Sequence, residues 1–208
     1  MTIIELLSNN AKLYSNEVSL VEREPSFGSR REITWLEFEN QANKIANALI
    51  DFGVKRGDKV VLLLMNSLEW LPCYFGILKT GAMAVPLNFR FTAEEIRKCI
   101  DVAEGKVLIY GPEFCERIAE IKNDLTCVEK FIFVENKLCH EDPSCSELKE
   151  SISNKHPDGY ITCDELLEKY PADDPGISIS DEEEAALYFT SGTTGIKLTD
   201  TAYKVLIK

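Results

Sequence analysis

The chain has 208 residues, a formal net charge of −12 at pH 7, 45% hydrophobic residues and 28% charged residues. This composition is typical of a soluble globular protein and excludes a disordered chain. The negative charge argues against non-specific binding to nucleic acid or to an anionic membrane, because both favour clustered Lys and Arg. No apolar run approaches the ~20 residues of a membrane helix, and the first residues lack a signal-peptide pattern, so we expect a cytoplasmic protein.

The cysteines and histidines indicate neither a disulfide framework nor a metal centre. The chain has seven cysteines, an odd number, and none are spaced as C-x-x-C, which predicts reduced thiols. The one possible ligand group is Cys139, His140, Cys145 and His156. Its spacing matches no common zinc pattern. No acidic or nucleophilic residue stands at a sequence spacing from either histidine that would indicate a catalytic pair, so we do not expect His140 or His156 to be catalytic.

Hydrophobic periodicity and helix-start signals predict alternating helices and strands. Three predicted helices begin with Thr-x-x-Glu, at Thr34, Thr92 and Thr162, in which hydroxyl and carboxylate cap the first free N–H groups. In chain order we expect a helix over 2–14, a strand over 18–22, a polar loop over 24–30, a helix over 34–52 ended by Gly53, a strand over 59–65, a helix over 68–80, a strand over 83–87, a helix over 92–103, a strand over 107–110, a helix over 113–122, a strand over 130–134, a polar loop over 135–160, a helix over 162–170, a solvated acidic linker over 171–184 and a strand over 185–189.

This order predicts one α/β unit, a mostly parallel sheet with helices on both faces. The run 59–65 is almost continuously apolar, as expected for a parallel strand that is covered on both sides. Trp35, Trp70 and Cys73 fall at helical spacing and are interpreted as core residues. No internal repeat is present.

The last predicted strand leads into a stretch made only of hydroxyl residues and glycines. Glycines allow a sharp turn with exposed N–H groups, and hydroxyls and a lysine add donors and charge, as a polyphosphate requires. The candidate phosphate-binding residues are Thr190, Ser191, Gly192, Thr193, Thr194, Gly195 and Lys197. The stretch is not a Walker A loop, because no Gly-Lys-Ser/Thr is present, and a P-loop ATPase is therefore disfavoured.

The stretch resembles the phosphate loop of the AMP-forming adenylate ligase superfamily, which reads approximately T-S-G-(S/T)-T-G-x-P-K-G. The match holds from Thr190 through Ile196 and then breaks, so that Lys197 stands one place early. Residues 33–49, 53–60, 66–82 and 85–96 also resemble successive motifs of the family, and residues 53–60 follow its G-V-x-x-G-D-x-V turn. Because these matches are collinear over 2–196, the chain is identified as similar to acyl-CoA synthetases.

The resemblance implies a fold, an activity and a set of ligands. It implies the N-terminal part of the adenylate-forming ligase fold over 1–208, with the remainder of that domain and its small mobile domain outside the chain. It also implies activation of a carboxylic acid, such as a fatty acid, by ATP and Mg²⁺ to an acyl-adenylate, followed by transfer to coenzyme A. The loop would hold the β- and γ-phosphates, and no catalytic residue is assigned to this chain.

The tail after Ile196 does not resemble the next segment of the family. We therefore expect a reading frame that was shifted or cut near Ile196, and an inactive fragment. The alternative is a non-catalytic module that binds a nucleotide or a partner chain. The sequence specifies neither the acid nor the oligomeric state.

Overall fold

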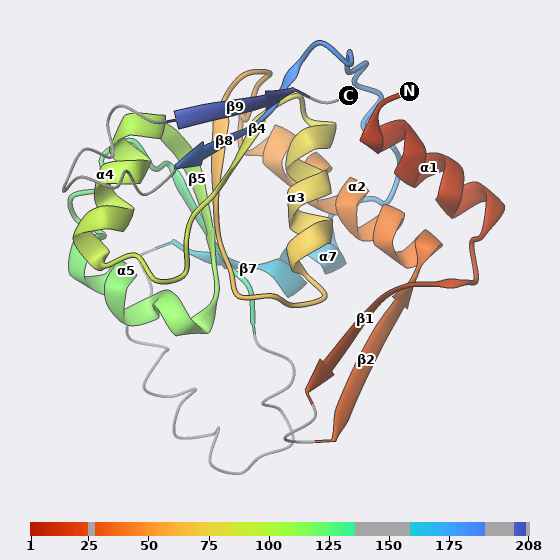
Figure 1. The fold of residues 1–208 in the computed structure, drawn as a ribbon, viewed down its shortest axis with the longest axis horizontal. Coiled ribbons are helices and arrows are strands. Elements are labelled where there is room, and N and C mark those ends of the chain that lie inside the picture. Colours follow the sequence, from red (N-terminus) through yellow and green to blue (C-terminus); the bar gives the residue numbers. More distant parts are fainter. Residues whose placement is uncertain (25–27, 136–158, 190–201, 207–208) are drawn as a thin grey trace.

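A sheet of seven strands organises the computed structural model, which describes residues 1–24, 28–135, 159–189 and 202–206 (Figure 1). The strands lie in the order β7-β6-β5-β3-β4-β8-β9. All neighbours are parallel except β9, which pairs antiparallel with β8. Their bounds are β3 (Lys59–Leu63), β4 (Met83–Pro86), β5 (Gly105–Tyr110), β6 (Lys130–Phe133), β7 (Ile161–Thr162), β8 (Glu184–Phe189) and β9 (Ala202–Leu206).

Helices cover both faces of this sheet, which confirms the predicted fold class (Figure 1). One face packs on α2 (Trp35–Asp51), α3 (Trp70–Lys79) and α7 (Cys163–Lys169), with α1 (Ile3–Leu13) outside α2. The other face packs on α4 (Ala93–Ala103) and α5 (Cys115–Ile121), which follows a short 3-10 turn, η2 (Pro112–Phe114).

The central strand β3 shows why its sequence is apolar without a break. Val60 and Leu62 belong to the cluster under α2 and α3, whereas Val61 and Leu63 belong to the cluster under α4 and α5. All four are at most 1% exposed. Successive side chains of a strand point to opposite faces, so a strand that is covered on both faces needs apolar residues at every position.

The connections reverse direction at β3. The chain passes from β3 to β4 on one side and then returns past β3 to β5 on the other. Because crossovers between parallel strands are right-handed, this reversal places α3 and α4 on opposite faces. The crevice at the carboxyl ends of β3 and β5 is therefore a topological switch point, the place where open α/β sheets commonly bind ligands.

Three predicted helix starts are confirmed by their hydrogen bonds. Thr34, Thr92 and Thr162 each accept a hydrogen bond from the backbone three residues later, and the glutamate there accepts one from the cap. The predicted stop after α2 is also confirmed, because Gly53 has φ of 83°. That left-handed conformation is costly for a residue with a Cβ.

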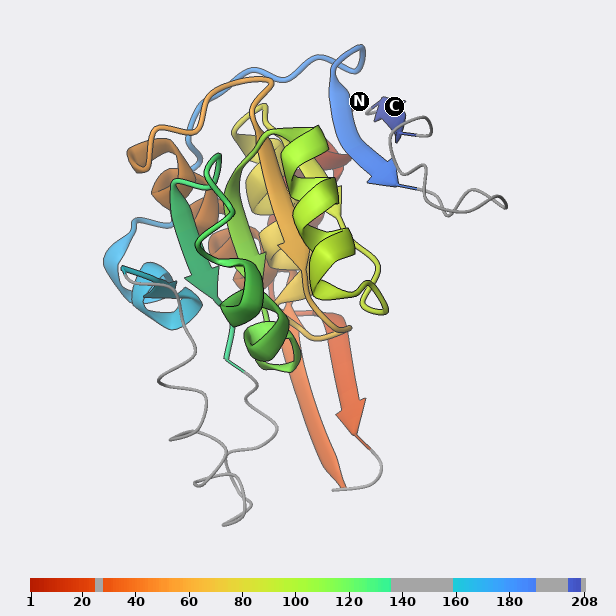
Figure 2. The same ribbon diagram turned by 90° about the vertical axis from the view of Figure 1, so that its left-hand side faces the viewer.

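The predicted polar loop over 24–30 is too long. After β1 (Val18–Glu24), a second strand β2 begins at Ser29 and runs to Thr34. The two form an antiparallel hairpin that extends away from the main sheet, as Figure 2 shows. The sequence did not predict β2 because its residues are mostly polar. Only one face of this hairpin is covered, and the outward positions of β2 carry Arg30 and Glu32.

The connection between α7 and β8 falls within residues 171–184, which were predicted to be a solvated acidic linker. Its side chains Asp173, Asp181 and Glu182 are exposed as expected. Its backbone, however, is fixed to α2: the side-chain amides of α2 donate to the carbonyls of residues 171, 172 and 173 at 2.9–3.0 Å. Arg56 also donates to the Ser178 carbonyl at 2.6 Å. We call residues 171–183 the α7–β8 connection.

Within the described residues, no helix is both long and apolar enough to cross a membrane. Of the predicted polar loop over 135–160, residues 136–158 lie outside the described part of the chain.

Candidate functional site

The candidate phosphate-binding residues follow directly from β8. All seven, residues 190–195 and 197, lie outside the described part of the chain. The structure nevertheless describes both ends of the segment that holds them: Phe189 at the end of β8 pairs with Ala202 at the start of β9. The segment 190–201 thus connects two antiparallel strands at the carboxyl edge of the parallel sheet.

Side chains from two helical layers fix the end of β8. Tyr188 and Tyr74 of α3 both pack against the cluster under α2 and α3, and the Tyr188 hydroxyl lies near enough to Tyr74 to affect its pKa. Burial, followed by the neighbouring Tyr188 hydroxyl, raises the pKa of Tyr74 above its ordinary value. Trp70 stacks on Tyr74 with ring centroids 5.2 Å apart. On the opposite face Phe189 packs on the α4–α5 cluster. The sequence analysis missed the Tyr74–Tyr188 pair, because residues 114 apart in sequence share no local pattern.

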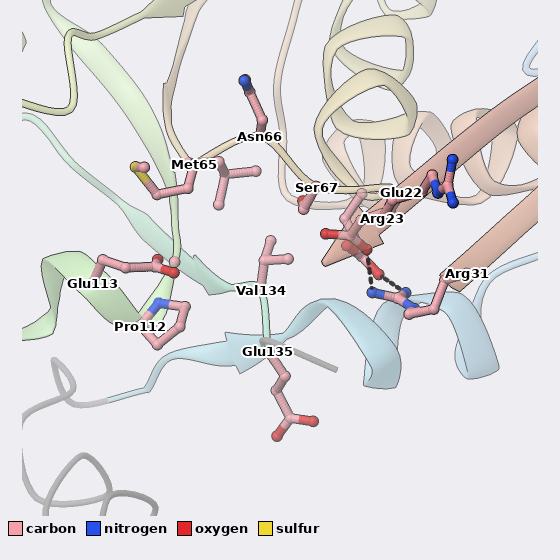
Figure 3. Close-up of a pocket in the computed structure, with 13 residues that line it drawn as sticks. Glu22, Arg23, Arg31, Met65, Asn66, Ser67, Pro112, Glu113, Val134 and Glu135 are labelled. Atoms are coloured by element: carbon pink, nitrogen blue, oxygen red, sulfur yellow. Dashed lines mark hydrogen bonds and ion pairs between the residues drawn. The ribbon is translucent and has the colours of Figure 1, made fainter. Parts of the chain in front are cut away.

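A second feature of this edge is a cavity of about 280 Å³ at the switch point (Figure 3). It lies beyond the carboxyl ends of β3, β5 and β6, with the β1–β2 hairpin as one wall. Leu64, Met65 and Val134 contribute apolar surface, and Glu113 faces the hairpin from the β5 side. In the sheet order β4 separates the strands that border this cavity from β8.

An arginine joins the hairpin to α3 on the wall of this cavity. Arg31 Nη1 lies 2.8 Å from Glu22 Oε2, and its Nη2 donates to Glu69 at the start of α3. The side chains of the two carboxylates are 12% and 8% exposed. Burial raises the pKa of Glu22 above its ordinary 4.5, Arg31 opposes that shift, and Glu69 adds to it. The hairpin is therefore held by a partly buried ion pair.

We expect Glu22 to titrate above 4.5 in the folded protein, as its carboxyl carbon shift in NMR would report. In an Arg31→Met variant the pKa of Glu22 should rise further, because the neighbouring positive charge is removed. A raised carboxyl pKa means that the folded state binds the proton more tightly, so the contribution of Glu22 to stability falls as pH rises from 4.5 through the folded pKa. A Glu22 pKa that stays the same or falls in Arg31→Met would contradict this arrangement.

The possible zinc ligands Cys139, His140, Cys145 and His156 lie outside the described residues. In the part of the chain that the structure does describe, no group of three or more His, Cys, Asp or Glu residues could hold a metal ion. The five described cysteines, at positions 73, 99, 115, 127 and 163, form no disulfide.

Comparison with known proteins decides the family. The model of the AMP-binding enzyme family matches residues 7–196. The chain belongs to this family. It is 28% identical over 179 residues to a long-chain-fatty-acid–CoA ligase of Mycobacterium tuberculosis, covering 83% of this chain and 29% of the relative. It is 27% identical over 184 residues to a crotonobetaine/carnitine–CoA ligase of Escherichia coli, covering 88% and 33%.

Solved structures show the same fold. An anthranilate–CoA ligase in complex with anthranoyl-AMP superposes with a TM-score of 0.76 at 28% identity, covering 94% of this chain and 33% of the other. The N-terminal domain of a Mycobacterium tuberculosis ligase, FACL13, superposes with a TM-score of 0.70 at 27% identity, covering 99% and 44%. This member of the AMP-binding enzyme family thus spans about a third of the length of the relatives that it matches.

Proposed function

We propose that this chain carries the nucleotide-phosphate-binding part of an ATP-dependent acid–thiol ligase. The observation that carries the proposal is the hydroxyl-glycine stretch 190–195 at the carboxyl end of β8, with both ends of its segment held by the Phe189–Ala202 pairing. The reaction would activate a carboxylic acid, such as a fatty acid, as an acyl-adenylate and pass it to coenzyme A. The names of the relatives support this substrate class.

The loop residues would bind the β- and γ-phosphates of ATP. Backbone N–H groups at glycines and the hydroxyls of Ser191, Thr193 and Thr194 are donors, and Lys197 adds a positive charge. Positioning and charge neutralisation of the leaving pyrophosphate account for most of catalysis in phosphoryl chemistry of this kind. Mg²⁺ would enter with ATP, bound chiefly by phosphate oxygens. The chain's own contribution is to bind and orient the phosphates.

Binding of Mg·ATP tests the proposal. A ligand that binds only the folded state raises the melting temperature, so Mg·ATP should shift thermal unfolding upward. A Thr193→Val variant should weaken ATP binding about tenfold, because it removes one hydroxyl donor to a charged phosphate. Thr126→Val is the matched control, since Thr126 is exposed in the turn that precedes β6, at the opposite edge of the sheet. Equal ATP affinity in Thr193→Val and the unmodified chain would count against the loop.

ATP–pyrophosphate exchange separates the ligase from its alternative. Exchange stimulated by a carboxylic acid requires adenylate formation, whereas a non-catalytic nucleotide-binding module would bind Mg·ATP without exchange. A panel of short, long-chain and aromatic acids would then define the substrate. Binding of Mg·ATP with no exchange for any acid would assign the chain a binding role only.

A further inference from the structure

A buried polar network joins α1, α2 and α3 beneath the α7–β8 connection. The Lys79 side chain on α3 is 2% exposed, and its Nζ lies 2.9 Å from Glu39 Oε1 on α2. Ser8 Oγ on α1 donates to the same Oε1 atom at 2.7 Å. Ser8 Oγ and Asp174 Oδ2 lie farther from Lys79 Nζ, at 3.4 and 3.7 Å. Glu39 Oε1 therefore has two donors, and the two buried charges neutralise one another.

Two acceptors beside this ion pair have no donor. Glu39 Oε2 and Asn43 Oδ1 are buried, and no described residue donates a hydrogen bond to either atom. The residues are 8% and 4% exposed. Glu39 and Asn43 stand four apart on α2, so they share one face of the helix with about 5–6 Å between their Cβ atoms. Buried polar atoms are almost always hydrogen-bonded, to protein or to ordered water, and two orphaned acceptors side by side need a donor.

The protein itself does not supply that donor. Reversing the Asn43 amide would replace its orphaned acceptor with a donor but would set its oxygen against the Ala172 carbonyl, to which the nitrogen now donates at 2.9 Å. A proton on Glu39 Oε2 could reach Asn43, but it would leave the Lys79 ammonium buried without its counter-ion. A cation bound between the two acceptors is disfavoured, because the Lys79 ammonium already neutralises Glu39. The remaining candidate is a neutral group with two donors.

We propose that an interior water molecule bridges Glu39 Oε2 and Asn43 Oδ1, donating one hydrogen to each. A water between two acceptors on one helix face satisfies both, as buried waters commonly do. A cavity of about 450 Å³ between α1 and the α7–β8 connection reaches the edge of the network, because it is lined by Ser8 and Asp174, the two outer members. The water completes the set of bonds by which α2 holds the connection that leads into β8.

The double variant Lys79→Met/Glu39→Gln tests the site. It removes both charges and keeps an oxygen for Ser8, and without Lys79 to hold it the new amide can move toward Asn43 Oδ1 and donate to it in place of the water. We expect it to lose one long-lived internal water in water ¹⁷O magnetic relaxation dispersion. Lys98→Met/Glu94→Gln is the matched control, because it removes an exposed ion pair on α4 and should lose none. An unchanged dispersion amplitude in the Lys79→Met/Glu39→Gln variant would overturn the proposal.

A neutron structure of the unmodified chain gives an independent result that does not depend on folding of a variant. Water density within about 3 Å of both Glu39 Oε2 and Asn43 Oδ1 would support the site. A deuteron on Glu39 directed at Asn43, or direct contact of the two side chains with no water, would overturn it.

Discussion

In a Lys79→Met variant we expect the free energy of unfolding to fall by about 3–5 kcal/mol, the range for removing one partner of a buried ion pair. Methionine keeps most of the volume of lysine, so the loss arises from charge rather than from packing. The Glu39 carboxylate would stay buried with Ser8 as its remaining donor from the protein. Because small domains are stable by about 5–15 kcal/mol, urea unfolding should detect this change readily.

The double variant separates the cost of an unpaired charge from the value of the pair. Adding Glu39→Gln to Lys79→Met removes the orphaned carboxylate, and we expect most of the lost stability to return, because neutral replacement of a buried ion pair is often tolerated. A double variant as unstable as Lys79→Met alone would show that the network stabilises by means other than charge neutralisation.

Local signals predicted most of the fold. The capping boxes at Thr34, Thr92 and Thr162 placed three helix starts, because hydroxyl and carboxylate act within one turn and need no tertiary context. Apolar runs gave β3, β4 and β5, since strands buried on both faces must be apolar at every position. Fold class followed from the alternation of these elements.

Features that depend on partners far away in the sequence could not be predicted from local signals. The strand β2 reads as polar, and it forms because β1 pairs with it and because Arg31 reaches Glu69 across 38 residues. The α7–β8 connection reads as a solvated linker, yet its carbonyls accept hydrogen bonds from α2 residues more than 120 positions earlier. Short β7 and β9 likewise depend on the strands that they join.

The candidate site likewise has one part that local sequence predicts and one part that depends on distant contacts. Composition and order of residues 190–195 indicate phosphate binding, because donors and glycines lie together in sequence. What holds the end of β8 is not local: Tyr188 packs with Tyr74 of α3 against one cluster, and the Phe189–Ala202 pairing joins the two ends of the segment. Motif analysis thus locates the loop, whereas the structure shows how its ends are held.

A close contact between α2 and α3 gives a second large effect. Gly76 lies in α3, where an added Cβ would meet Ile45 Cγ2 at 2.7 Å and the Ala42 carbonyl oxygen at 3.0 Å. In an open helix Gly→Ala stabilises by about 1 kcal/mol. Here the helices must separate, and we expect Gly76→Ala to lower the free energy of unfolding by about 1–3 kcal/mol, the usual cost of overpacking. Urea unfolding with an unchanged m-value would measure it.

A double-mutant cycle with Ile45→Leu would show that this loss comes from the named contact. Leucine is not branched at Cβ, so it removes the Cγ2 atom that Gly76→Ala would strike, while conserving volume at a cost of under about 1.5 kcal/mol alone. The pair should therefore be more stable than the sum of the single changes predicts, by about 0.5–3 kcal/mol. Rescue should be partial, because the Cβ atom of residue 45, which the added methyl group would meet at 2.8 Å, and the Ala42 carbonyl oxygen both stay in place. Strictly additive losses would mean that the spacing of the two helices is set elsewhere.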